Sequence, residues 1–163
     1  MNANDLIARG ETALGIELGS TRIKGVLCDF SGNTLATGFF EWENKLEHGV
    51  WTYSLEDAEK GLRACYSSLR ENIREKYGVT PRSFGAIGIS AMMHGYIALD
   101  EKGRQLAPFQ TWRNTNTQKA ADELTSLFDF NIPLRWSCAH LYQRALDKEP
   151  HVPRVASVFT LAA

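Results

Sequence analysis

Residues 13–35 read ALGIELGSTRIKGVLCDFSGNTL, and this stretch decides the fold. Two apolar runs, 13–18 and 23–30, are separated by a Gly-Ser-Thr-Arg break, and a Ser-Gly-Asn turn follows the second run. Short apolar runs bounded by turn residues are typical of strands. Connections this short join only antiparallel neighbours. Together with residues 34–43, the stretch therefore predicts a three-stranded antiparallel meander.

The residues after the meander predict a helix and then a parallel strand. Ser54 followed by Asp57 is similar to a capping box, and apolar residues recur at three- and four-residue steps as far as Tyr77, just before Gly78. The apolar run 84–90 predicts a strand buried on both faces, reached by a crossover from the meander. Further predictions are a loop at 44–53, helices at 117–128 and 136–148, and a strand at 155–163. The expected fold class is α/β, with a mixed sheet and flanking helices.

Composition limits the class of protein. The chain has 163 residues, the size of one domain, with 44% hydrophobic and 23% charged residues and a net charge of −1. We expect no nucleic-acid partner and no membrane, because the charge is balanced and no apolar run is long enough to span a bilayer. Residues 1–11 lack the apolar core of a signal peptide and are expected to form a flexible leader. Cys28, Cys65 and Cys138 are expected to be buried free thiols, and no metal-ligand spacing occurs.

The turn between the first two strands carries more polar chemistry than a turn requires. In a hairpin, the backbone N–H groups of residues 19–22 and the hydroxyls of Ser20 and Thr21 would suit a phosphate oxygen. Lys24 could reach the same anion. Glu17 is compatible with a phosphate there if a divalent cation lies between its carboxylate and the phosphate. The alternative is a solvated polar tip, which composition alone favours because short polar turns are common. The chain has neither a P-loop motif nor a GxGxxG motif.

SAMMHG, residues 90–95, is a second candidate because it follows directly on a predicted buried strand. In open α/β sheets, ligands bind at the carboxyl ends of strands. There His94 could hydrogen-bond a polyol hydroxyl while Met93 packs against the polyol carbons. A core histidine with a backbone partner is an alternative of equal weight.

TWRNTNT, residues 111–117, is a third candidate. Trp112 offers a flat face for a sugar, and Arg113 and Asn114 offer directional hydrogen bonds. The alternative is a loop that ends in a helix cap, with Thr115 or Asn116 beginning the next helix. This alternative is the favoured interpretation when the stretch is taken alone.

Taken in order, GIELGSTRIKGVLCDFSGN, IGISAMMHG and WRNTNT resemble the FGGY family of carbohydrate kinases, and most closely its xylulokinase-like branch. The resemblance runs from Ala13 onward. It implies the ribonuclease-H-like, actin-like ATPase fold, with residues 12–163 as the N-terminal part of the first of two domains. This fold would be incomplete here. The resemblance also implies that the second domain, the adenine-binding segments and the general-base Asp lie beyond Ala163.

The resemblance assigns roles to the residues of the first turn. Gly19, Ser20 and Thr21 would face the phosphates of ATP, and Lys24 would support them. Glu17 takes the place of the family's usual Asp, which helps to hold Mg²⁺ through water. The implied cofactors are therefore ATP and Mg²⁺.

The resemblance also assigns a sugar site. Met93 and His94 match sugar-contacting positions. A second substrate-contacting stretch, typically Trp-x-Asp-x-Arg, is matched in part by Trp112, Arg113 and Asn114. Here Asn114 replaces the Asp and Asn116 replaces the Arg.

The implied protein is a cytoplasmic kinase that transfers the γ-phosphate of ATP to a hydroxyl of a ketopentose or related polyol. Its partners would be the small sugar substrate and the remainder of the kinase chain, and a homodimer is allowed. The 163-residue chain alone is expected to be inactive. The departures at Glu17, Asn114 and Asn116 leave open an alternative, a non-catalytic member that binds a sugar or a partner.

Overall fold

The computed structural model describes residues 2–162, which divide into two compact units. The first unit comprises the residues up to Glu43 and Glu56–Ala91, and the second comprises Asn44–Leu55 and the residues from Met92 onward. The elements in chain order are α1 (Ala3–Arg9), β1 (Ala13–Leu18), β2 (Arg22–Cys28), β3 (Thr34–Glu41), β4 (Lys45–Glu47), β5 (Val50–Thr52), α2 (Leu55–Tyr77), β6 (Ala86–Ala91), β7 (Ile97–Leu99), α3 (Gln118–Phe128), α4 (Ser137–Leu146), the 3₁₀ helix η1 (Val152–Arg154) and β8 (Ser157–Phe159).

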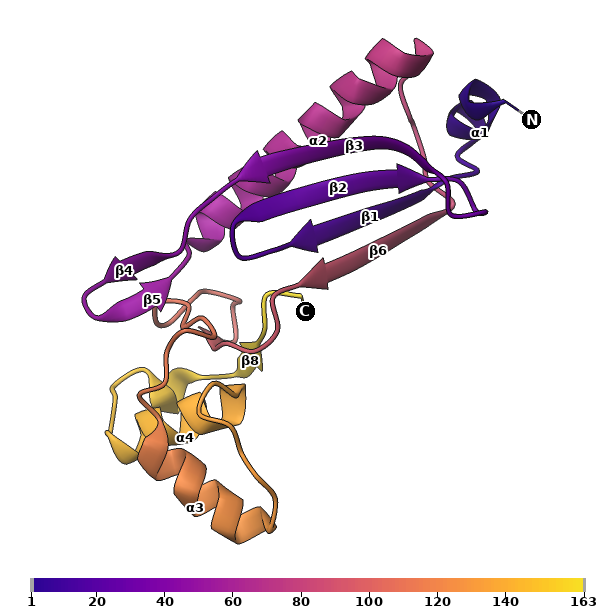
Figure 1. The fold of residues 1–163 in the computed structure, drawn as a ribbon. Coiled ribbons are helices and arrows are strands. Elements are labelled where there is room, and N and C mark those ends of the chain that lie inside the picture. The colour runs from indigo at the N-terminus through magenta and orange to yellow at the C-terminus, as the bar shows by residue number, and fades with distance from the viewer. Residues whose placement is uncertain (1, 163) are drawn as a thin grey trace. The chain divides into compact units, whose positions relative to one another are not determined.

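The first unit is built on a four-stranded mixed sheet in the order β3-β2-β1-β6. β1, β2 and β3 are antiparallel neighbours, and β6 runs parallel to β1, with Ala13 opposite Ala86 and Leu18 opposite Ala91. Figure 1 shows α2 lying along one face of this sheet. The predicted meander, the crossover helix and the α/β fold class are therefore confirmed.

The crossover helix α2 packs on the sheet through one apolar stripe. Its buried residues include Cys65, Leu69 and Ile73, and the last two share a core cluster with Leu14 and Leu27 of the sheet. The helix spans the predicted residues 55–77 and is followed by Gly78 in the left-handed conformation, with φ +67°. The stripe at helical spacing is the reason that sequence alone placed this helix correctly.

The contact between α2 and β3 requires glycine at position 38. A Cβ atom at Gly38 would lie 2.3 Å from the backbone nitrogen of Leu69 and 2.6 Å from the carbonyl oxygen of Cys65. Both neighbours are helix backbone, which cannot move aside as a flexible side chain can. The absence of a side chain at Gly38 therefore sets how closely α2 approaches the sheet.

The N-terminal residues differ from the expected flexible leader. Asn2 caps α1 by accepting a 2.9 Å hydrogen bond from the backbone N–H of Asp5, and Gly10 ends the helix with φ +72°. Ile7 is fully buried in the same core cluster as Leu14. The prediction was wrong for residues 3–9, because one buried side chain and two caps fix a helix too short to show a periodic pattern.

β6 also differs from its prediction. It was expected to be buried on both faces, yet Ile87 and Ile89 are 61% and 62% exposed. Among the residues that the structure describes, β6 pairs only with β1, so its other edge has no strand partner. The apolar sequence was interpreted correctly as a strand, but its burial depends on neighbours that these residues do not supply.

The second unit contains two small sheets and two packed helices. β4 and β5 form an antiparallel hairpin, so the prediction of a loop at 44–53 was wrong. β7 and β8 form the other pair, which shortens the predicted strand at 155–163 to residues 157–159. The predicted helices at 117–128 and 136–148 are confirmed as α3 and α4, which pack around Ala121, Ile132 and Ala139.

The cysteines are free, as expected, but only Cys65 is buried, because Cys28 is half-buried and Cys138 is exposed. In residues 2–162, no group of three or more His, Cys, Asp or Glu side chains is arranged to hold a metal ion. Within the same range, no helix combines the length and the apolar character needed to cross a membrane.

We expect Gly38→Ala to lower the free energy of unfolding by roughly 3 kcal/mol, because its methyl group overlaps helix backbone. The matched control is Gly88→Ala in β6, where an added Cβ meets no atom within 4 Å. Urea unfolding of the two variants beside the parent chain measures the difference. Equal stability of the two variants would contradict the argument from close approach.

Candidate functional site

The β1–β2 turn is closed tightly at its base. Gly19 donates a 2.9 Å hydrogen bond from its backbone N–H to the carbonyl oxygen of Arg22. A Cβ atom at Gly19 would lie 3.0 Å from that same oxygen, so the turn favours glycine there. Ser20 and Thr21 form the exposed tip. The structure thus places the three predicted phosphate-binding residues of the turn together on one hairpin.

Trp42, which directly follows β3, holds this turn in place by two hydrogen bonds. Its indole Nε1–H donates a 2.8 Å hydrogen bond to the carbonyl oxygen of Gly19, and its backbone N–H donates a 3.2 Å bond to that of Thr21. Sequence analysis missed Trp42. The register of the meander could have indicated it, because Glu41 lies opposite Arg22 and the next residue therefore reaches the turn.

Glu17 and Lys24 lie opposite each other on β1 and β2 and form an ion pair of 3.0 Å between Lys24 Nζ and Glu17 Oε2. Both side chains are about half exposed, so the pair adds little to stability. They line a shallow hollow of about 440 Å³ on the sheet, together with Gly15, Val26 and residues 88–90. The other carboxylate oxygen of Glu17, Oε1, faces Gly19, 3.7 Å from the position of an added Cβ.

These donors suit the phosphates of a nucleotide and a magnesium ion. Hydroxyls, backbone N–H groups and an ammonium group are phosphate ligands. Mg²⁺ prefers oxygen ligands and keeps several of its waters, which suits a carboxylate one methylene longer than Asp. The chemistry of the residues in the hairpin therefore fits both groups.

A second set of predicted residues lies in the second unit. Met93 is 72% exposed, and His94 adopts the left-handed conformation with φ +66°, which is uncommon for a residue other than glycine. Burial and the nearby positive charge of Arg135 lower the pKa of His94. The imidazole is therefore neutral at pH 7 and can both donate and accept a hydrogen bond.

The segments that carry the second and third motifs lie side by side. Tyr96 and Gln110 exchange two backbone hydrogen bonds of 2.9 and 3.1 Å as an antiparallel bridge. His94 lies two residues before this bridge and Trp112 two residues after it, which places both at the same end of the paired segments. Gly95 permits the close approach, since an added Cβ would lie 2.6 Å from the Phe109 ring.

Asn114 has a structural part in this arrangement. Its side-chain amide donates to the carbonyl oxygen of Trp51 at 2.7 Å and to that of Thr111 at 3.0 Å, while its Oδ1 accepts from the N–H of Trp51 at 3.0 Å. Both N–H donors of the amide are therefore used on backbone. These bonds hold β5 against residues 111–114, although Trp51 and Asn114 are 63 residues apart.

Arg113 is exposed, and its guanidinium lies near two indole rings. Its guanidinium carbon is 4.6 Å from the ring centre of Trp51 and 5.7 Å from that of Trp112. Sequence analysis noted no role for Trp51, whose place beside Arg113 depends on the bonds made by Asn114. The expected helix cap at Thr115 or Asn116 is wrong, because α3 begins after Thr117.

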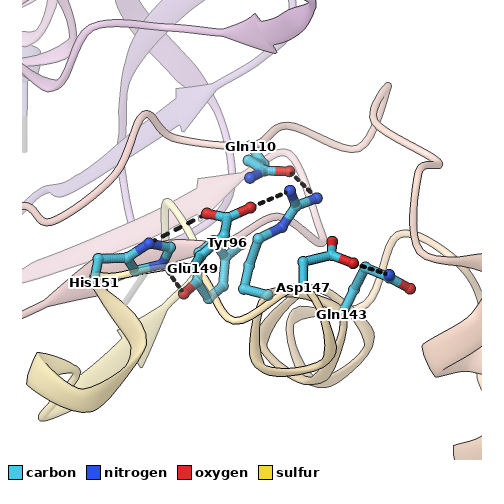
Figure 2. A network of polar contacts seen from close by, with 7 residues as sticks. Tyr96, Gln110, Gln143, Asp147, Glu149 and His151 are labelled. Carbon is cyan, nitrogen blue, oxygen red and sulfur yellow. Dashed lines mark hydrogen bonds and ion pairs between the residues drawn. The ribbon is translucent and has the colours of Figure 1, made fainter.

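A network of buried polar side chains supports both paired segments. Figure 2 shows Tyr96, His151, Glu149 and Gln110 around an arginine of α4, which is Arg144. The hydroxyl of Tyr96 lies 2.9 Å from His151 Nε2, and Glu149 accepts from Arg144 at 2.7 Å. Arg144 also donates to Gln110 at 3.4 Å. The network therefore ties the residues next to the predicted sugar site to α4 and η1.

Comparison with known proteins decides the family. The model of the FGGY family of carbohydrate kinases, N-terminal domain, matches residues 12–132. The chain belongs to this family. Its fold is that of solved family members: a xyloylose kinase from Brucella ovis matches 91% of the chain with a TM-score of 0.80 at 23% identity. A gluconate kinase from Lactobacillus acidophilus matches 91% with a TM-score of 0.64 at 17% identity.

The similar proteins are much longer than this chain. The xylulose kinase of Lactococcus lactis is 26% identical over 120 residues, which cover 69% of this chain and 22% of that protein. The xylulose kinase of Staphylococcus xylosus is 23% identical over 122 residues, 75% of this chain and 24% of that protein. The chain thus spans less than a quarter of these relatives, and 32% of the Brucella ovis protein.

Asn114→Ala is expected to lower the free energy of unfolding by about 2 kcal/mol, because it removes the partner of the Trp51 N–H and one of the two donors to the Trp51 carbonyl oxygen. It should also shift the tryptophan fluorescence, since β5 then keeps only the 3.1 Å bond from the N–H of Thr111 to Trp51 in place of three hydrogen bonds. Asn116→Ala, at an exposed position two residues away, is the control and should change neither. Identical thermal unfolding of both variants would contradict a structural part for Asn114.

We expect His140 to make the stability of the chain depend on pH. This side chain of α4 is fully buried against the Tyr96 ring, and its pKa is lowered to about 4 by burial and by the charge of Arg144. As the pH falls below 6.5, the unfolded chain gains a proton that the folded chain takes up only near pH 4. Stability is therefore full above pH 6.5 and falls by up to about 3 kcal/mol by pH 4.

Urea unfolding between pH 7 and pH 4 measures this loss, and His140→Phe should remove most of it while keeping a ring against Tyr96. The control is His48→Asn, at an exposed turn position with φ +49°. A pH profile of His140→Phe that parallels the parent would refute the assignment to His140.

Proposed function

We propose that this chain is part of a cytoplasmic ATP-dependent carbohydrate kinase that phosphorylates a hydroxyl of a small sugar or polyol. The observation that carries the proposal is the β1–β2 hairpin. It presents Gly19, Ser20 and Thr21 at a braced tip, with the Glu17–Lys24 pair beside it. A solvated turn needs neither the indole brace nor a carboxylate and an ammonium group on adjacent strands.

In this proposal, the hairpin binds the phosphates of ATP. Thr21 and Ser20 donate hydrogen bonds to phosphate oxygens, and Lys24 exchanges part of its contact with Glu17 for the anion. Glu17 would then hold a magnesium ion through water molecules. The bound Mg²⁺ supplies charge neutralisation on the phosphates during transfer.

The second unit positions the sugar. His94 hydrogen-bonds a hydroxyl, Met93 packs against the carbon chain, and Trp112 presents its ring face. In the transfer step, the sugar oxygen forms a bond to the γ-phosphorus and the bond from that phosphorus to the β–γ bridging oxygen breaks, which releases ADP. The hydroxyl proton passes to a carboxylate that we place in the remainder of the kinase chain.

The names of similar proteins support a ketopentose as the first substrate to try, because the two curated relatives are xylulose kinases. The exposed edge of β6 supports a longer kinase chain as partner, because a strand from that chain would cover Ile87 and Ile89. A non-catalytic binding protein is the second candidate. It is favoured by the amide of Asn114, which is used on backbone where the family typically has a charge.

The test is ADP release by the product of the complete reading frame, with ATP, Mg²⁺ and a panel of ketoses, aldoses, polyols and sugar acids. We expect turnover of at least one sugar and a loss of roughly 10- to 100-fold in kcat/KM for Lys24→Gln. Lys60→Gln is the matched control, since Lys60 forms an exposed ion pair with Glu56 on α2. The 163-residue chain alone should show no turnover. Absence of turnover with every sugar would favour the non-catalytic candidate.

A further inference from the structure

Two arginines at the predicted sugar site have no acidic partner. Arg113 and Arg135 are both exposed, and within the described residues neither forms an ion pair with a carboxylate. Other arginines of the second unit are paired, such as Arg104 with Asp100 at 2.8 Å and Arg144 with Glu149 at 2.7 Å. Among the described residues, the two arginines of this unit without an acidic partner therefore both lie at the predicted sugar site.

Arg113 lies against an aromatic ring whose backbone is anchored. Its guanidinium lies against the ring of Trp51, and the backbone of Trp51 is fixed on both its N–H and its carbonyl by Asn114. A guanidinium stacked on an aromatic face keeps its in-plane N–H groups free for a planar anion. A carboxylate matches this edge with two parallel hydrogen bonds.

Arg135, in the loop before α4, adds positive charge beside His94. Its carbonyl oxygen accepts a 3.4 Å hydrogen bond from the N–H of Gly95, and its charge acts on the adjacent His94. Gly95 and Thr111 are the direct neighbours of the Tyr96–Gln110 bridge. Arg113 therefore follows one of the two paired segments, and the backbone of Arg135 contacts the other at Gly95.

We propose that the sugar bound here is a sugar acid, whose carboxylate accepts two hydrogen bonds from Arg113 while Arg135 adds to the positive field. This inference rests on the proposed function, because it names the substrate class of the same site. It also bears on Asn116, which stands where the family typically has an arginine, because Arg113 supplies a guanidinium three residues earlier in the same stretch.

D-Xylonate and xylitol test the proposal, because they share their carbon number and differ in the carboxylate. Binding to the 163-residue chain is followed through the arginine Nε–H resonances in NMR spectra, with acetate as a bare carboxylate. We expect D-xylonate to shift the Arg113 signal and to bind at least about 10-fold more tightly than xylitol or acetate, less so at high salt. Equal binding of the three compounds, or no binding, would overturn the proposal.

Variants separate recognition from folding. Arg113→Gln should weaken D-xylonate binding about 10-fold with little effect on xylitol, and Arg113→Lys should weaken it about 3-fold because the charge remains without the planar edge. Arg82→Gln, at an exposed arginine of the first unit, is the matched control. Unchanged D-xylonate binding by a folded Arg113→Gln variant would refute the assignment.

Turnover by the complete kinase separates this inference from the proposed function. Phosphorylation of D-xylulose but not of D-xylonate would uphold the kinase and overturn the sugar acid. Binding of D-xylonate through Arg113 without turnover of any sugar would uphold the recognition and overturn the kinase. Phosphorylation of D-xylonate that is lost on Arg113→Gln supports both.

Discussion

The close approach of α2 to β3 at Gly38 is the constraint on which the first unit depends. Because a Cβ there would overlap the backbone of Leu69, only glycine lets the helix lie directly on the sheet. The apolar stripe of α2 then covers β1, β2 and β3, and the helix returns the chain to begin β6 parallel to β1. A helix held further out would leave Leu14 and Leu27 partly hydrated. The sheet that carries the β1–β2 turn would then lose its packed face.

Both candidate binding regions are held by residues outside their motifs. Trp42 fixes the first turn through the carbonyl groups of Gly19 and Thr21. In the second unit, Asn114 fixes the backbone of Trp51, and the Arg144 network fixes Tyr96 and Gln110. Rigid support of this kind keeps binding groups in place before a ligand arrives, which lowers the entropy lost on binding.

Sequence predicted the features that local spacing encodes. The meander, α2 and the clustering of polar groups at the first turn follow from strand length, the helical stripe and turn chemistry, each contained within one continuous stretch of the chain. The features it missed depend on distant partners. β5 is hydrogen-bonded to Asn114, 63 residues away. The helix α1 is anchored by Ile7 in a core that distant residues build, and the exposure of β6 depends on which strands flank it. The candidate site was also incompletely predicted, because Arg113 and Trp51 are distant in the sequence and no periodic pattern or motif links them.

The distribution of charge in the second unit has a similar explanation. Arg144 and Glu149 are largely buried and pair with each other, so their desolvation is offset only when the geometry is kept. Such a pair contributes little net stability, but it orients Arg144, whose second nitrogen donates to Gln110 of the Tyr96–Gln110 bridge at 3.4 Å. The guanidinium groups of Arg113 and Arg135, by contrast, are exposed and have no carboxylate partner among the described residues. The net charge of −1 for the whole chain gives no indication of this difference, because it adds paired and unpaired charges alike.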